Sequence, residues 1–137
     1  MSASARTSSL AAYRSTAAFG GVAASDPHGL ILLLIDGALD RIAAAQGCMK
    51  NGAHAEKSAL VHRAVSIIAE LRGSLNIADG GELAANMADL YDYLCRRLMT
   101  GVSMNRADVL EEVAGLLREI RSAWILIPVE ARSSRRS

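Results

Sequence analysis

The feature that most constrains the fold is a set of apolar residues that recur at helical spacing between short helix-breaking sequences. The clearest example is the run of Leu90, Leu94 and Leu98, which stand four apart and therefore share one face of a helix. Tyr91 and Tyr93, two of the chain's five aromatic residues, flank this stripe. Such a stripe is more often the core of a bundle than a binding face, so the rest of the chain has to decide between the two.

Start and stop signals divide most of the chain into four helices. Asp26 can cap a helix that begins at Pro27 and ends at Asn51-Gly52. Asp79 followed by Glu82 resembles a capping box, and Asn105 with Asp108 opens the last helix. Pro128 ends that helix. The predicted helices therefore cover about 27–50, 54–76, 79–101 and 105–127.

Helical spacing also predicts which residues are buried. In the last three helices the expected core positions are Leu60, Ala64, Ile67, Ile68, Leu71 and Leu75, then Leu83, Met87, Leu90, Leu94 and Leu98, then Val109, Val113, Leu116, Leu117, Ile120 and Trp124. The first helix is apolar nearly all round from Leu30 to Gln46, so we expect it to lie centrally. Long helices joined by short links favour antiparallel neighbours. The predicted fold class is all-α, an antiparallel up-down four-helix bundle with an irregular N-terminal segment.

Composition separates the two ends from this bundle. We expect an N-terminal segment at 1–25, the bundle at 26–128 and a flexible basic tail at 129–137. The formal net charge is +1, and two short basic ends on a mildly acidic body indicate solvated termini, with no nucleic-acid surface. The N-terminal segment is rich in small residues but also carries Leu10, Tyr13 and Phe19. Two readings stay open: a disordered tail, or a lid that covers a groove on the bundle.

The residues do not form a recognisable site for catalysis, metal or membrane insertion. The three histidines have no ligand spacing, and the two cysteines stand alone: His28, His54, His62, Cys48 and Cys95. The longest apolar run, Leu30–Ile35, is far shorter than the roughly 20 residues that span a bilayer. We therefore expect a cytoplasmic protein that is not an enzyme and uses no cofactor or metal.

Five stretches, in order along the chain, resemble the FliS family, the cytosolic export chaperones of bacterial flagellin. They are Ser25–Ile31, Leu34–Ala38, Ala64–Leu71, Gly80–Tyr93 with its Gly-Gly-Glu-Leu and Leu-Tyr-Asp-Tyr sequences, and Ala123-Trp124. One departure is Ile35, which stands where the family commonly has tyrosine. The resemblance covers about residues 10–126, nearly the whole chain.

The resemblance implies a protein that binds the C-terminal region of flagellin, prevents its premature polymerisation and delivers it to the export gate. It also implies that Tyr13 lies in a region used for client and export-gate contacts. The candidates for client binding or for the lid are Leu10, Tyr13, Phe19, Ile67, Ile68, Leu71, Leu90, Tyr91, Leu94 and Trp124. The alternative is a client-free helical adaptor or dimerisation module, and a homodimer is left open in either case.

Overall fold

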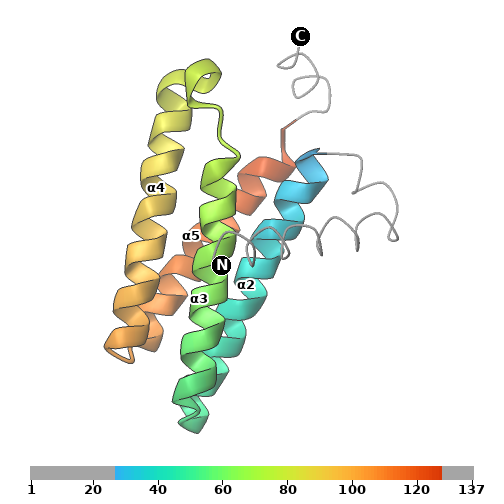
Figure 1. The fold of residues 1–137 in the computed structure, drawn as a ribbon. Coiled ribbons are helices and arrows are strands. Elements are labelled where there is room, and N and C mark those ends of the chain that lie inside the picture. Colours follow the sequence, from blue (N-terminus) through green and yellow to red (C-terminus); the bar gives the residue numbers. More distant parts are fainter. Residues whose placement is uncertain (1–26, 128–137) are drawn as a thin grey trace, which may run out of the picture.

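The computed structural model of this protein describes residues 27–127, apart from the side chains at 77–79. Four helices make up this part of the chain: α2 (Pro27–Asn51), α3 (His54–Gly73), α4 (Ile77–Ser103) and α5 (Ala107–Ile125). In Figure 1 the chain descends through α2, rises through α3, descends through α4 and rises again through α5. The all-α bundle is confirmed, while the predicted N-terminal lid or tail and the basic C-terminal tail lie outside the described residues.

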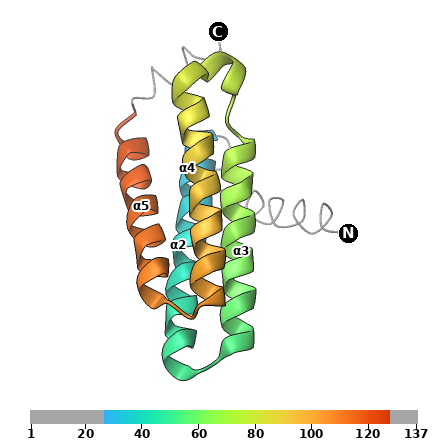
Figure 2. The ribbon, with the colours of Figure 1, turned by 90° about the vertical axis from the view of Figure 1, so that its left-hand side faces the viewer.

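The four helices form a ring in which each packs against two neighbours. α2 packs against α3 and α5, and α4 packs against the same two helices. Figure 2 shows α3 and α5 on opposite sides of the bundle. The expectation that the first helix lies centrally was therefore wrong, because in such a ring every helix occupies a corner. One face of α2 is fully buried, whereas Leu30, Ile31, Leu32 and Leu33 are only half-buried.

The helix ends follow the predicted breaks to within a few residues, and the differences are informative. The first helix begins at Pro27 as expected and is followed by Gly52, whose positive φ of 71° suits glycine. α3 ends at Gly73, three residues early, where the Ser74 hydroxyl donates a hydrogen bond to the Leu71 carbonyl oxygen at 2.7 Å. α4 begins at Ile77 but is interrupted at Gly81, whose φ of 59° and ψ of −134° are not helical.

The start of α5 also differs from the prediction. Arg106 occupies the N-cap position of α5, and no side chain caps the helix there. Asn105, predicted to open this helix, has a φ of 52°, and its side-chain oxygen instead accepts a 2.9 Å hydrogen bond from Lys57 Nζ on α3. A short polar residue tolerates this left-handed conformation, so Asn105 forms the turn between α4 and α5.

The core contains the predicted faces of α3 and α5. In the first half of α4, however, the buried face is rotated about the helix axis relative to the predicted one. Leu94 and Leu98 are completely buried, as expected. Leu83 is 65% exposed, and the buried positions before Leu94 are Ala84, Ala88 and Tyr91. Leu83 lies two residues after Gly81, where the backbone leaves the helical conformation. Within the described residues, none of the helices is long and apolar enough to cross a membrane.

Candidate functional site

The predicted site residues fall into three structural groups. Ile68, Leu71 and Leu94 have 0–1% of their surface exposed, and Ile67 and Tyr91 are 6% and 5% exposed. Leu90 and Trp124 are half-buried, and Leu10, Tyr13 and Phe19 lie outside the described residues. The structure thus brings the first five together in one core. Of the described candidates, Leu90 and Trp124 are the two with substantial surface to offer a partner.

Trp124 joins the end of α5 to the start of α2. Its indole Nε1 donates a 3.0 Å hydrogen bond to the carbonyl oxygen of His28, and His28 Nε2 lies 2.5 Å from the carbonyl oxygen of Trp124. The two rings are stacked, with centroids 4.8 Å apart and an angle of 10° between their planes. We call this reciprocal pair of contacts the His28–Trp124 clasp. It fixes the half-buried tryptophan at the end of the bundle where α2 begins.

An ion pair lies farther along the same two helices. Arg121 Nε donates to Asp36 Oδ1 at 2.6 Å, and Arg121 Nη2 donates to Asp36 Oδ2 at 3.3 Å. The hydrogen bond to Asp36 raises the pKa of Arg121, so the guanidinium stays charged. Asp36 therefore ties α2 to α5.

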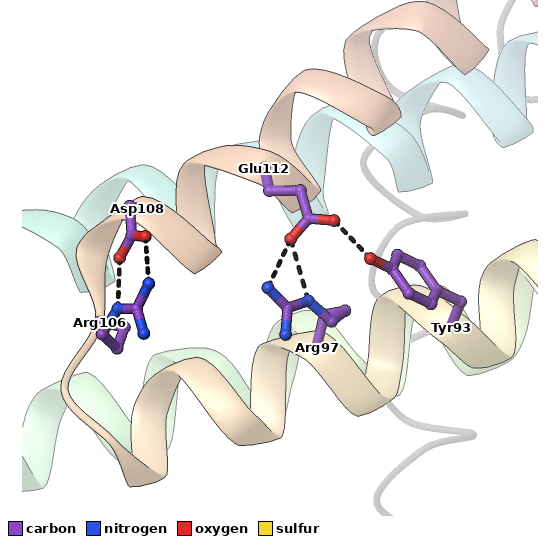
Figure 3. A network of polar contacts seen from close by, with 5 residues as sticks. All are labelled: Tyr93, Arg97, Arg106, Asp108 and Glu112. Atoms are coloured by element: carbon purple, nitrogen blue, oxygen red, sulfur yellow. Dashed lines mark hydrogen bonds and ion pairs between the residues drawn. The ribbon is translucent and has the colours of Figure 1, made fainter.

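A second polar network connects α4 to α5 (Figure 3). Glu112 accepts a hydrogen bond from the Tyr93 hydroxyl at 2.5 Å and another from Arg97 Nε at 2.9 Å. The hydrogen bond from Tyr93, followed by that from Arg97, lowers the pKa of Glu112. The same bond to Glu112 is the main reason that the pKa of Tyr93 is raised. Tyr93 was noticed in the sequence only as a flank of the stripe, and its partner on α5 was missed.

The contact between α3 and α4 has a different character. Arg72 and Asp92 form an ion pair at 2.8 Å, and the Cys95 thiol lies 3.8 Å from the carbonyl oxygen of Val65. Burial raises the pKa of Cys95, with a smaller contribution from Asp92. A raised pKa keeps the thiol protonated near neutral pH, and the thiol is then a poor nucleophile. This side chain therefore serves packing between the two helices.

Exposed apolar side chains lie toward the two ends of the bundle. The exposed fraction is 65% for Leu83, near the start of α4. At the end of α5 it is 47% for Ile125 and 79% for Leu126. Met99 and Met104, around the end of α4, are 38% and 61% exposed. Within residues 27–127, no cluster of histidine, cysteine, aspartate and glutamate could hold a metal ion. The polar contacts described above join one helix to another, and the exposed apolar side chains lie apart from them.

The fold and these contacts define the class of the protein as a helical bundle with surface-exposed apolar groups. The profile of the family described as "Flagellar protein FliS" matches residues 9–131. The chain therefore belongs to the FliS family of flagellar proteins.

Relatives in three bacteria are similar to the chain over most of its length. It is 42% identical over 103 residues to "Flagellar secretion chaperone FliSB" of Pseudomonas aeruginosa, a match that covers 75% of this chain and 82% of the relative. "Flagellar secretion chaperone FliS" of Salmonella typhimurium is 36% identical over 125 residues, covering 90% and 93%. The protein of that name in Vibrio cholerae is 33% identical over 122 residues, covering 89% and 90%. The family resemblance predicted from the ordered motifs is confirmed.

Proposed function

We propose that this protein is a cytoplasmic flagellar export chaperone that binds the C-terminal region of flagellin. It keeps flagellin from polymerising prematurely and delivers it to a component of the export gate. The observation that carries the proposal is family membership across nearly the whole chain, together with relatives that are named flagellar secretion chaperones. The described residues include no helix that could span a membrane, which is compatible with work in the cytoplasm.

The physical chemistry of the bundle suits the capture of an unfolded segment. A flexible client loses conformational entropy when it becomes ordered, so it needs a wide apolar contact to compensate. Burial contributes about 25 cal/mol per Å² of apolar surface, part of which offsets that entropy. The half-buried stretch Leu30–Leu33, together with Leu90 and Trp124, supplies apolar surface of this kind. Ile31 and Leu90 of that surface pack against the core, which contains the buried candidates Ile67, Ile68, Leu71, Tyr91 and Leu94.

The N-terminal segment is proposed to act as a lid. In this view residues 10–19 cover the client groove through Leu10, Tyr13 and Phe19 while flagellin is absent, and Gly20-Gly21 is the hinge. Deleting residues 1–19 should then increase the binding of a hydrophobic dye and speed association with flagellin. Unchanged dye binding together with an unchanged association rate would favour a plain tail.

The proposal includes no catalytic turnover, cofactor or nucleic-acid partner. Holding and release of flagellin are then binding equilibria, driven by the relative affinities of the chaperone and the export gate for the client. The alternative, a client-free adaptor or dimerisation module, predicts self-association without affinity for flagellin. Sedimentation velocity of the purified chain, alone and with flagellin, distinguishes the two, and it also shows whether a homodimer forms.

The decisive experiment is a calorimetric titration of the full chain with two forms of flagellin. Full-length flagellin should bind one to one, and flagellin without its C-terminal region should bind at least tenfold more weakly. Equal affinity for the two forms would refute the assignment of the client region. Absence of binding to either form, with the chaperone shown to be folded by circular dichroism, would refute the client itself.

A further inference from the structure

The end of α5 is attached to the bundle differently from its beginning. Val113 and Leu117 are fully buried in the core. In the described chain after Leu117, no side chain is buried: Ile120 is half-buried, and Ile125 is 47% exposed. Because apolar burial is the main source of attachment between helices, packing holds the last two turns weakly. We call residues 118–125 the terminal segment of α5.

Ile120 is the residue of this segment that packs against the core, and polar contacts to α2 add to that contact. They are the Asp36–Arg121 ion pair and the His28–Trp124 clasp described above. The side chains of Asp36 and Arg121 are 44% and 38% exposed, and ion pairs with that much solvent contribute little to stability. The contacts of Glu112 with α4 lie before the segment begins. Two discrete attachments to one neighbouring helix, with little burial beneath, allow a segment to open separately.

An apolar residue of α2 lies between these two attachments. His28 and Asp36 are eight residues apart on α2, and Leu32 stands one helical turn from each of them. This spacing places Leu32, which is half-buried, on the stripe of α2 that carries both attachments to α5. Movement of the terminal segment away from α2 would expose this leucine and its neighbours.

We propose that the terminal segment of α5 opens from α2 as a unit while the rest of the bundle stays folded, and that this opening uncovers the apolar stripe around Leu32 for the flagellin segment. The second half of this statement rests on the proposed function, whereas the first half concerns the bundle alone. Sub-global openings of this kind occur at the less stable elements of a fold, and elements that move on binding are drawn from them.

Hydrogen exchange followed by NMR on the full chain tests the first half. After correction for their intrinsic exchange rates, amides of 118–125 should share one opening equilibrium constant, at least tenfold larger than that of 113–117. Arg121→Gln should raise this opening constant at least threefold and leave the exchange of α2, α3 and α4 unchanged. Arg118→Gln is the matched control, because Arg118 pairs with Glu111 on α5 itself, and it should leave the opening constant unchanged.

Three results would overturn the separate opening. The first is an opening constant that increases steadily toward the end of the helix, because that is simple fraying. The second is the same opening constant in 113–117 and in 118–125. The third is an equal effect of Arg121→Gln and Arg118→Gln on that constant.

Stopped-flow fluorescence with a synthetic peptide of the flagellin C-terminal region tests the second half. Trp124 is the chain's one tryptophan, so its emission reports the clasp directly. Arg121→Gln should speed peptide association at least threefold relative to both the unmodified chain and Arg118→Gln. An unchanged rate would refute the role of opening in client binding. If the peptide binds none of the three proteins, the proposed function fails, and the exchange experiment still decides whether the segment opens.

Discussion

The close approach of α4 to α5 at Gly101 gives a prediction with a definite sign. Gly101 is buried against the first turn of α5. A Cβ placed on it would lie 2.6 Å from Leu110 Cδ1, 3.1 Å from Val109 Cγ1 and 3.2 Å from Val109 Cβ. Leu110 is completely buried, and a β-branched valine has little freedom about χ1, so neither neighbour can move aside easily. Gly101→Ala should therefore force the two helices apart.

The magnitude follows from two opposed terms. Replacing a helical glycine by alanine favours folding by about 1 kcal/mol in a helix interior, and by less in the last turn of a helix. Overpacking by an extra methyl group in a tight core costs roughly 1–3 kcal/mol. The net effect of Gly101→Ala is a loss of about 1–2 kcal/mol, which lowers the thermal midpoint of a domain of this size by several degrees.

A second glycine provides the control for this prediction. Gly47 lies inside α2, and a Cβ there would meet nothing within 4 Å. Gly47→Ala should therefore raise stability by about 0.5–1 kcal/mol through helix propensity alone. Urea unfolding followed by circular dichroism measures both variants. If Gly101→Ala stabilised the chain as much as Gly47→Ala, the contact between α4 and α5 would be looser than the geometry indicates, and the reasoning would be refuted.

Three further predictions concern the core, the acid response and metal dependence. Leu94→Asp should abolish cooperative unfolding or cost several kcal/mol, because it buries an unpaired carboxylate. Arg96→Ala on the exposed face should change stability by about 0.5 kcal/mol or less. If thermal melts showed Arg96→Ala to be the more destabilising change, the orientation of α4 about its own axis would be contradicted. The hydrogen bond from Arg106 holds the pKa of Asp108 at about 2, so its stabilising effect is complete above about pH 4 and is lost as the pH falls toward 2. Asp108→Asn should make the loss of urea stability between pH 4 and 2.5 smaller, and an equal loss in both proteins would argue against the pair. Thermal unfolding with and without EDTA should coincide, and a lower midpoint under chelation would reveal a bound metal.

Local signals in the sequence predicted the elements well and the turns less well. The two ends of α2 lie at Pro27 and at Asn51-Gly52 as expected, because proline and glycine act through the backbone alone. Asn105 was misread because a residue suited to capping is equally suited to a left-handed turn, and contact with Lys57 from another helix decides between them. The register of α4 was predicted correctly where Leu94 and Leu98 dominate. It was wrong at Leu83, which follows the non-helical Gly81 by two residues, a break that residue spacing alone does not reveal.

The contacts between helices could not be predicted from spacing. His28 and Trp124 are 96 residues apart, and their stacking depends on the rotation of two helices about their own axes. The same is true of Tyr93 and Glu112, which meet only because α4 and α5 approach each other there. The ordered motifs nevertheless identified the family, because residue order along the chain carries that information without any knowledge of the packing.

The ring of four helices has a mechanical consequence. The start of α2 lies beside the end of α5, so the chain enters and leaves the bundle at the same end, as Figure 1 shows. A force applied between these two points acts across the contact of α2 with α5, perpendicular to the helix axes. It would therefore break the contacts one after another, first the stacked rings and then the ion pair of Asp36. Tension applied in this way unzips the protein at low force, whereas a bundle pulled from opposite ends must shear many contacts at once.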